Sequence, residues 1–490
     1  MIGDTMDTAT VDKTTAHNEQ APRSSSATPQ TALQQALTSA DESPERVALE
    51  VRGALPVWLT GMLVRNGPGR WDFDESEVNH WFDGLSMLHS FDFADGGVNY
   101  CNRFVRSNAY RAVEETGKLG FSEFASDPCR TRFQRIQSMF SPNVTDNPNV
   151  SVHKFGEKFI AMSEIPLAME FDPNTLETVG VAFENPDMFA SAHPHQDVEH
   201  GAMINLSCKL GARSSQSFFR LAPNGKPQRI AKFNRRMPTY QHSFGMTDRW
   251  LILTEFPLVV DPIDILKTGR PFIENFQYRP TRGTKITAID RETGKVGGVW
   301  EADAGFCFHH VNAYEDGEDL VVDLCRFDDA SIVEQLYLKR LREDGSASIG
   351  HLHRYRLSPG RKRADEKRLS ETPLELPRIN YGANNGKAYR FAYGVSSTDE
   401  YSLNMLAKID VETGESLTWS EGDCAVGEPV FVASPEQRSE DDGVLLSVVL
   451  DGSSGRSFLL VLDAANLSEI ARAEVAHGIP AGFHGSYVKH

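Results

Sequence analysis

Four histidines in this chain recur at nearly the same distance behind a strand-to-turn pattern. In each case a short hydrophobic run ends in a polar turn, and a histidine follows 19 to 21 residues later. The four are His193, His242, His309 and His484. Histidines at one position of a repeated unit can converge on an axis, and four converging imidazoles form a metal site. A second histidine lies close to two of them, at His195 and His310, and the spacing leaves those alternatives open.

An all-histidine ligand set narrows the chemistry of such a site. Neutral imidazoles leave the ion its full positive charge. Hydrolytic zinc usually has three protein ligands and a water, and many non-haem iron oxygenases use two histidines and one carboxylate. Four histidines on an octahedral iron would leave two positions open, which is enough for dioxygen. Spacing alone does not separate iron from zinc or manganese.

The strand-to-turn pattern itself repeats seven times and must position these histidines. Its copies begin near residues 92, 172, 222, 290, 358, 410 and 463. A β-rich unit that recurs about every 62 residues is typical of propeller blades, each of four antiparallel strands, with the turn in the outermost hairpin. We therefore expect an all-β fold. Specifically, we expect a seven-bladed β-propeller in which loops and short helices form a cap over the axial metal site.

Two of the repeats that lack a histidine carry an acidic residue near the equivalent place. Glu375 and Glu428 follow their turns by 17 and 18 residues. A carboxylate there can accept the ring N–H of a ligand histidine and fix the tautomer that binds metal. The alternative is an ordinary solvated or ion-paired glutamate, which is the commoner fate of this residue type.

Composition divides the chain into a tail and one large domain. Residues 1–45 are rich in Thr, Ser, Ala, Gln, Asp and Pro, which predicts a disordered polar tail, and residues 46–490 are long enough for a single propeller domain. The tail has no apolar core of a signal peptide, and no apolar run of about 18 residues exists, so we expect a cytoplasmic protein that is neither secreted nor membrane-spanning. A net charge of −18 argues against nucleic acid as a partner, and no obligate protein partner is evident.

Several motifs resemble those of the carotenoid cleavage oxygenase family over nearly the whole chain after the tail. They are Arg65-Asn66-Gly67-Pro68-Gly69, Trp81-Phe82-Asp83-Gly84, the histidine segments, Asn312-Ala313-Tyr314-Glu315-Asp316 and Gly427-Glu428-Pro429-Val430-Phe431. The resemblance implies a seven-bladed propeller with Fe(II) held by His193, His242, His309 and His484. It also implies that Glu164, Glu375 and Glu428 accept hydrogen bonds from three of these histidines. Glu164 does not fit the offset and rests on the resemblance alone.

Other segments are similar to the animal-type branch of that family, among them Val322-Asp323-Leu324-Cys325 and the stretch from Glu375 to Tyr381. The resemblance implies that O2 splits one C=C bond of β-carotene or an apocarotenoid, with the central 15,15′ bond and retinal as the leading expectation. The alternatives are eccentric cleavage, stilbene cleavage or retinyl-ester isomerohydrolysis on the same iron centre. A more distant alternative is an interaction propeller without chemistry.

A carotenoid-cleaving enzyme must take its substrate from a membrane. Two segments mix aromatic and aliphatic residues with basic ones, as an interfacial patch does. Their candidate residues at the membrane or at a tunnel mouth are Phe121, Phe140, Phe256 and Leu258. The resemblance favours peripheral membrane contact, and ordinary cover over one face of the propeller is the alternative.

Overall fold

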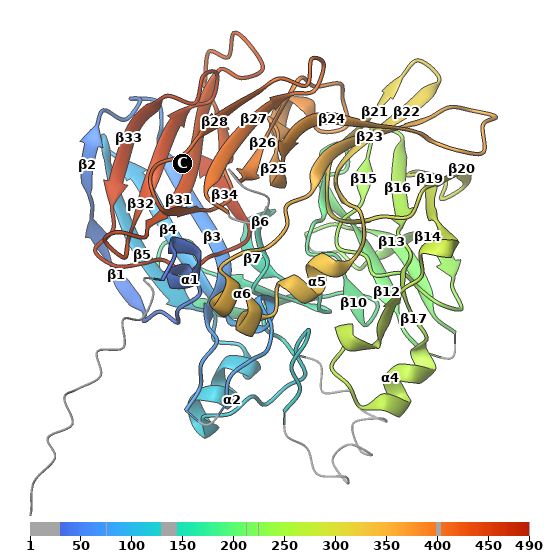
Figure 1. Cartoon of the computed structure of the whole chain (residues 1–490), viewed down its shortest axis with the longest axis horizontal. Coiled ribbons are helices and arrows are strands. Elements are labelled where there is room, and N and C mark those ends of the chain that lie inside the picture. Colours follow the sequence, from blue (N-terminus) through green and yellow to red (C-terminus); the bar gives the residue numbers. More distant parts are fainter. Residues whose placement is uncertain are drawn as a thin grey trace, which may run out of the picture. The chain divides into compact units, whose positions relative to one another are not determined.

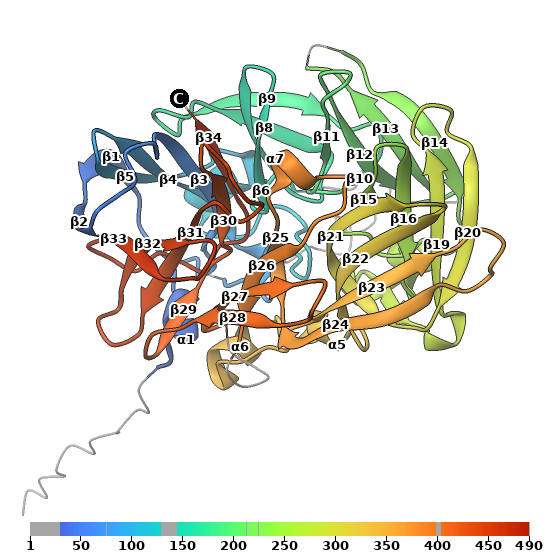
Figure 2. The same cartoon turned by 90° about the horizontal axis from the view of Figure 1, so that it is seen from above.

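The computed structural model describes residues 30–489, except 75, 129–144, 212, 224 and 398–402. The chain divides into two units, Met1–Gln30 and Thr31–His490, and the fold described below is that of the second. Within its described residues, antiparallel strands form seven sheets of four or more strands and one two-stranded hairpin. Figure 2 shows the sheets arranged around a common centre. The predicted seven-bladed β-propeller is confirmed.

The blades are built of antiparallel strands that succeed one another from the centre of the ring outward. Blade 1 has β34 (Gly485–Lys489), β3 (Gly61–Arg70), β4 (Leu85–Ala94), β5 (Gly97–Phe104) and β1 (Ser43–Ala48). Blade 2 has β6 (Ser151–Phe155), β7 (Lys158–Met162), β8 (Leu167–Phe171) and β9 (Thr178–Glu184). Blade 3 has β10 (Phe189–Ala190) and β11 (His195–Asp197), then β12 (Ala202–Lys209), β13 (Ser215–Leu221) and β14 (Gln228–Asn234). Blade 4 has β15 (Gly245–Met246), β16 (Trp250–Glu255), β19 (Thr284–Asp290) and β20 (Val296–Ala302).

The remaining blades continue the same plan. Blade 5 has β21 (Phe306–Asp316), β22 (Asp319–Phe327), β23 (His351–Leu357) and β24 (Asp365–Pro373). Blade 6 has β25 (Glu375–Arg378), β26 (Phe391–Ser396), β27 (Met405–Asp410) and β28 (Ser416–Trp419). Blade 7 has β29 (Cys424–Val426) and β30 (Val430–Ala433), then β31 (Gly443–Asp451), β32 (Arg456–Asp463), β33 (Glu469–Glu474) and β2 (Glu50–Gly53). The separate hairpin pairs β17 (Leu258–Val260) with β18 (Phe276–Tyr278).

All seven turn patterns found in the sequence join the third strand of a blade to the fourth. Asp290 shows why this turn repeats. Its carboxylate accepts hydrogen bonds from the backbone N–H and the hydroxyl of Thr293, each at 2.8 Å. These bonds hold the pKa of Asp290 at about 2. An aspartate that binds its own turn in this way fixes the reversal without help from the rest of the fold. The outermost hairpin is therefore specified locally.

The ring is closed by strands from both ends of the chain. Strand β34 pairs with β3 and forms the innermost strand of blade 1, with Leu63 opposite Tyr487. Strand β2 pairs with β33 and forms the outermost strand of blade 7, with Val51 opposite Ala473. Each of these blades thus contains strands from distant parts of the sequence, and neither sheet is complete until the ring closes.

Hydrophobic clusters fill the interfaces between neighbouring blades. Leu63 and Phe91 of blade 1 pack with Leu446 of blade 7. Similarly, Ile252 of blade 4 packs with Val322 of blade 5. Successive side chains of a strand point to opposite faces of the sheet. In the inner strands both faces are buried, whereas the outermost strands expose one face. These contacts fix the blades relative to one another, which makes their inner edges a rigid frame.

Short helices and 3-10 turns are inserted between strands. They are α1 (Ala32–Ala36), α2 (Asn108–Thr116), α4 (Pro262–Thr268), α5 (Ser331–Gln335), α6 (Leu338–Asp344), α7 (Tyr381–Asn384), η1 (Trp81–Asp83), η2 (Ile273–Asn275) and η3 (Pro280–Arg282). Figure 1 shows α2, α4, α5 and α6 on one side of the sheets. Buried residues of α2, α5 and α6 share one apolar cluster with Trp81, Phe308 and Phe483. The predicted cap is present.

In the part of the chain that the structure describes, no helix is long and apolar enough to cross a membrane.

The folded part begins before the predicted boundary at residue 45. Helix α1 buries Ala32 and Leu33, and the backbone N–H of Ala32 donates to Asp423 at 3.1 Å. Strand β1 starts at Ser43 and is the outermost strand of blade 1. The polar composition of this segment predicted a tail, because a short helix and an edge strand need few apolar residues. Residues 1–29 of the predicted tail lie outside the described residues.

The prediction that Phe256 and Leu258 face a membrane is wrong. Phe256 is only 4% exposed and packs in the core between blades 4 and 5. Leu258 is 6% exposed and begins β17, which pairs with β18 beneath the cap. An apolar segment that forms a buried hairpin has the same composition as an interfacial patch. Phe121 is half-buried, and Phe140 lies outside the described residues.

Candidate metal centre

The four histidines lie at the inner ends of four different blades. His193 stands two residues before β11, His242 three before β15 and His484 directly before β34, while His309 is the fourth residue of β21. Glu375 and Glu428 occupy the same place on blades 6 and 7, as the first residue of β25 and two residues before β30. Glu164 differs, because it follows β7 in the connection to β8.

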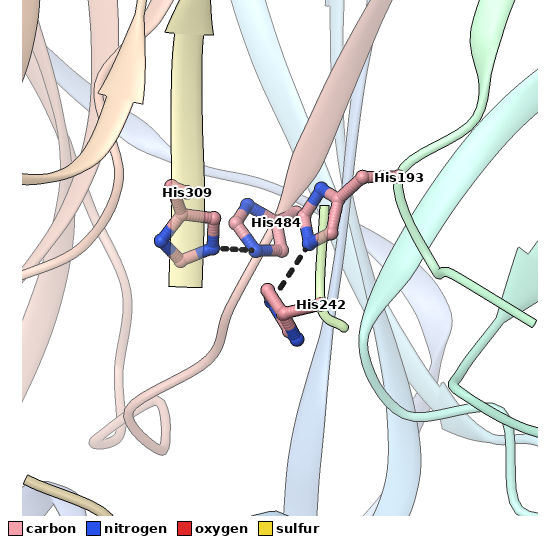
Figure 3. A group of neighbouring side chains, drawn as sticks. All are labelled: His193, His242, His309 and His484. Carbon is pink, nitrogen blue, oxygen red and sulfur yellow. Dashed lines mark hydrogen bonds between the residues drawn. The ribbon is translucent and has the colours of Figure 1, made fainter. Parts of the chain in front are cut away.

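The imidazole rings turn their Nε2 atoms toward one another (Figure 3). The Nε2 atoms of His193 and His242 are 2.9 Å apart, and those of His309 and His484 are 3.2 Å apart. One ligand atom from each of the four lies within 4.8 Å of the others. The structure therefore brings together the four histidines that the family resemblance implied as ligands.

Three of the rings are held from behind by carboxylates. The Nδ1 atoms of His242, His309 and His484 lie 2.6, 2.5 and 2.7 Å from carboxylate oxygens. Those oxygens belong to Glu164, Glu375 and Glu428 respectively. A neutral imidazole that donates its Nδ1 proton to a carboxylate has a bare lone pair on Nε2. His193 has no carboxylate partner among the described side chains.

This arrangement fits a metal ion. Burial, together with the neighbouring histidines, lowers the pKa of His193 well below its ordinary value. Burial also lowers the pKa of His309 well below that value and the pKa of His484 to about 4, against the opposing effect of Glu428 on both. The rings of His193, His309 and His484 are therefore neutral near pH 7. Bare nitrogen lone pairs about 3 Å apart repel one another unless a cation lies among them, and imidazole nitrogens suit zinc, copper, iron and nickel.

Glu428 is fixed by the most extensive set of partners. Arg378 contacts both of its carboxylate oxygens, with Nε at 2.8 Å from Oε1 and Nη2 at 2.9 Å from Oε2. The backbone N–H of Gly485 donates to Oε2 at 2.8 Å. Burial raises the pKa of this carboxyl, but Arg378 and His484 outweigh burial and hold the pKa far below its ordinary value. Glu428 is therefore ionised and oriented toward His484.

The other two carboxylates have weaker support. Glu164 accepts a hydrogen bond from the Tyr240 hydroxyl, which lies 2.9 Å from each of its oxygens. Glu375 accepts from the backbone N–H of Leu376 at 2.8 Å, and its second oxygen has no partner among the described residues. Burial raises the pKa of Glu375 to about 7, partly offset by the Leu376 N–H and two histidines.

A largely apolar cavity of about 480 Å³ opens beside the histidines. His242, His309, His484, Glu164 and Glu375 contribute to its wall. Most of the remaining lining is aromatic and aliphatic: Trp81, Phe82, Phe124, Ile165, Met188, Phe189, Leu210, Ile265, Phe272, Phe308, Phe327, Ile332, Leu336, Ile349, Val395, Leu403 and Phe483. Such a cavity suits a ligand that is mainly hydrocarbon.

The neighbouring histidines serve the fold. The ring of His195 contacts the Tyr381 hydroxyl at 3.0 Å through Nδ1 and the Phe244 carbonyl at 3.0 Å through Nε2. The ring of His310 contacts Ser243 at 2.8 Å and Thr254 at 2.9 Å. With both nitrogens of each ring occupied, neither histidine is free to bind a metal.

Two residues of the site were not predicted from the sequence. Tyr240 precedes His242 by two residues, and Arg378 lies three residues after Glu375. Both carry a polar group beside a proposed ligand or acceptor, and that proximity was the available signal. Their partners, Glu164 and Glu428, are 76 and 50 residues away, so the contacts depend on the assembled ring.

Comparison with known proteins gives the same family along nearly the whole chain. The family model described as retinal pigment epithelial membrane protein (RPE65) matches residues 37–489. The human protein named β,β-carotene 15,15′-dioxygenase is 33% identical, over 91% of this chain and 93% of that protein. The mitochondrial carotenoid-cleaving dioxygenase of Mustela putorius furo is 32% identical, over 92% and 95%. The carotenoid isomerooxygenase of Galleria mellonella is 30% identical, over 91% and 94%.

Solved structures show the same fold. The cobalt-substituted apocarotenoid oxygenase of Synechocystis superposes with a TM-score of 0.83 at 25% identity, covering 94% of this chain and 98% of that one. A chimera of that oxygenase and RPE65 gives a TM-score of 0.82 at 25% identity, covering 94% and 98%. The resemblance inferred from the motifs is confirmed. The chain belongs to the retinal pigment epithelial membrane protein family, which is the family of the carotenoid oxygenases.

Proposed function

We propose that this chain is a non-haem iron(II) dioxygenase that splits one C=C bond of a carotenoid. Both atoms of O2 enter the products, so that R–CH=CH–R′ and O2 give two aldehydes. The leading assignment is the central 15,15′ bond of β-carotene or of an apocarotenoid, with retinal as a product. The observation that carries this proposal is the convergence of four Nε2 atoms, paired at 2.9 and 3.2 Å, at the wall of an apolar cavity.

In this proposal the four histidines hold the metal and three carboxylates orient them. His193, His242, His309 and His484 would be the ligands of Fe²⁺, with Glu164, Glu375 and Glu428 accepting the Nδ1 protons of three rings. When bound, ferrous iron would activate O2 so that it can react with a closed-shell alkene. The protein fixes the ring tautomers and keeps the Nε2 lone pairs available.

The cavity positions the polyene. Phe82, Phe308 and Phe483 line it. The ring of Phe82 contacts the other two, with centroids 5.8 Å from Phe308 and 5.2 Å from Phe483. Such rings pack against a conjugated chain and exclude water from the reacting bond. Because the oxygen atoms come from O2, this reaction needs no protein nucleophile and no acid–base pair.

Iron content and product analysis test the assignment together. The protein is purified under nitrogen, loaded with Fe²⁺ and given β-carotene, an apocarotenal, a stilbene and a retinyl ester in separate assays. We expect one iron per chain, one O2 consumed per bond split, and aldehydes whose masses identify the bond. Iron-loaded protein that forms no aldehyde from any polyene overturns the proposal. Isomerised retinol formed without O2 uptake would assign the isomerohydrolase reaction instead.

Adjacent histidines provide a matched pair of variants. His309→Ala removes a proposed ligand, while His310→Ala removes a neighbour whose nitrogens bind Ser243 and Thr254. We expect iron to be lost in the first variant and retained in the second, with both remaining folded by circular dichroism. An iron-replete, active His309→Ala protein contradicts the ligand set.

We also propose peripheral contact with a lipid surface on the cap side. The support comes from helix α4, where Ile265 lines the cavity and Ile263 is 52% exposed on the same short helix. The experiment is sedimentation with phosphatidylcholine vesicles. Ile263→Asp should reduce binding several-fold, while Val299→Asp, at a similarly exposed position (46%) of outer strand β20, should not. Equal binding by both variants removes this site of contact.

A further inference from the structure

One buried glutamate of the cavity wall is not used by the metal centre. Glu123 lies between α2 and strand β6 of blade 2 in the chain and lines the same cavity as the histidines. It is 5% exposed, and its Oε1 atom has no hydrogen-bond partner among the described residues. A buried polar atom without a hydrogen-bond partner destabilises the fold unless a ligand supplies that partner.

Asp83 and Asp146 are the two acidic residues whose charges act on Glu123, and both already accept hydrogen bonds. Asp83 accepts from the Ala125 N–H at 2.9 Å and from the Ser126 hydroxyl at 2.7 Å. Asp146 accepts from two backbone N–H groups at the start of α2, at 2.7 and 2.8 Å. Of these three acidic residues, Glu123 is therefore the one with a carboxyl oxygen that has no hydrogen-bond partner among the described residues.

Its surroundings keep Glu123 protonated. Burial raises the pKa of this carboxyl well above its ordinary value, and the charges of Asp83 and Asp146 raise it further, against hydrogen bonds from Thr145 and Asn147. A neutral carboxylic acid offers one O–H donor and an acceptor oxygen. It can therefore donate to a carbonyl oxygen and can exchange hydrogen bonds with a hydroxyl.

We infer that Glu123 binds an oxygen atom of the substrate, so that the cavity prefers a polyene bearing a hydroxyl or carbonyl group over the pure hydrocarbon. This inference rests on the proposed carotenoid-cleaving function and specifies its substrate class. A hydrocarbon would leave the Oε1 atom of Glu123 without a partner in a largely apolar cavity, whereas an oxygenated end group would supply one. Sites built to hydrogen-bond a substrate oxygen discriminate strongly against analogues that lack it.

Equilibrium binding tests this preference without turnover. Iron-loaded protein is titrated under nitrogen with β-carotene, hydroxylated β-carotene and an apocarotenal, and tryptophan fluorescence is followed because Trp81 lines the cavity. We expect the oxygenated ligands to bind roughly tenfold more tightly than β-carotene. Glu123→Leu should abolish that ratio, and Glu123→Gln, which retains a donor and an acceptor, should keep most of it.

Thr268→Val is the matched control. Thr268 lines the same cavity, but its hydroxyl already donates to Asn275 at 2.5 Å, so this variant should keep the wild-type ratio. Equal affinity of wild-type protein for the hydrocarbon and its hydroxylated counterpart overturns the inference, whether or not Glu123→Leu folds. An unchanged ratio in folded Glu123→Leu overturns it as well. Failure of the proposed function is a separate result, seen as absence of aldehyde from every polyene.

Discussion

Glu428 and Glu123 are glutamates of similar burial whose surroundings give them opposite charge states. Glu428 lies beside His484 and is contacted by the guanidinium of Arg378, which keeps it ionised. Glu123 lies in the cap near Asp83 and Asp146, with no cation to stabilise its charge among the described residues around it, and is neutral. Burial alone raises the pKa of both. The difference shows that the partners of a buried carboxyl, more than its depth, decide whether it orients a ring or hydrogen-bonds a ligand.

The largest expected effect comes from replacing Glu428, the ionised one of these two glutamates, with a neutral residue. Glu428→Gln leaves Arg378 without its carboxylate and removes the oriented acceptor of His484. We expect a loss of about 3 kcal/mol in the free energy of unfolding, because Glu428 is buried and the charge of the half-buried Arg378 loses its partner. Urea denaturation measures the loss, and iron content should fall with it. Wild-type stability in this variant would show that the ion pair is not maintained in solution.

Asp83, in the acidic group of the cap, should make stability depend on pH. Burial raises the pKa of Asp83 to about 7, against hydrogen bonds from Ser126 and Ala125. A folded-state pKa above the unfolded value means that the folded state binds the proton more tightly. Its stabilising contribution is complete below pH 4 and declines as pH rises toward 7.

We therefore compare Asp83→Asn with the wild type at pH 5 and pH 8 by urea denaturation. The wild type should lose about 2 kcal/mol more than the variant between these values. Identical pH dependence of the two proteins would mean that Asp83 is ionised in the fold.

Glu375→Gln should cost less stability than Glu428→Gln. Glu375 has no cationic partner among the described side chains, and its pKa is already raised to about 7, so a neutral amide replaces a group that is readily protonated. We expect a stability loss of about 1 kcal/mol and a 10- to 100-fold loss of metal affinity, as for other carboxylates behind ligand histidines. Metal titration with a competing chelator measures the affinity. A stability loss equal to that of Glu428→Gln would erase the distinction between the two sites.

The smallest effect is expected at Tyr240. Tyr240→Phe removes one hydroxyl that donates to Glu164 and leaves the carboxylate bound to His242. We expect a loss of at most about 1 kcal/mol in stability and a few-fold loss of metal affinity, both smaller than for Glu375→Gln. A larger loss of iron than in Glu375→Gln would place Tyr240 among the main supports of the site.

The sequence predicted what the repeat specifies. Register identified the four histidine segments, because every blade presents the same position at its inner end. The family resemblance then selected His193 over His195 and His309 over His310. Register also identified Glu375 and Glu428 for the same reason. Register did not identify Glu164, because this residue lies in the connection between β7 and β8 rather than at an inner strand end.

Contacts between residues of different blades could not be predicted from the sequence. The pairing of Arg378 with Glu428, and of Tyr240 with Glu164, depends on which blades become neighbours. Phe256 was misplaced for a related reason: its apolar surroundings in sequence fit a membrane patch as well as the interface between blades 4 and 5. Composition likewise missed α1, whose burial depends on contacts with the distant strands β29 and β31.

If the proposed metal centre is occupied, the closing strand β34 couples assembly of the ring to metal binding. His484 directly precedes this strand, and β34 pairs with β3, so the last ligand enters the cluster only as the ring closes. An ion that binds only the complete set of four therefore favours the closed ring over open or partly assembled forms. The metal content of a preparation would then measure the fraction of chains with a closed ring, because a mispaired or unclosed chain would bind no metal.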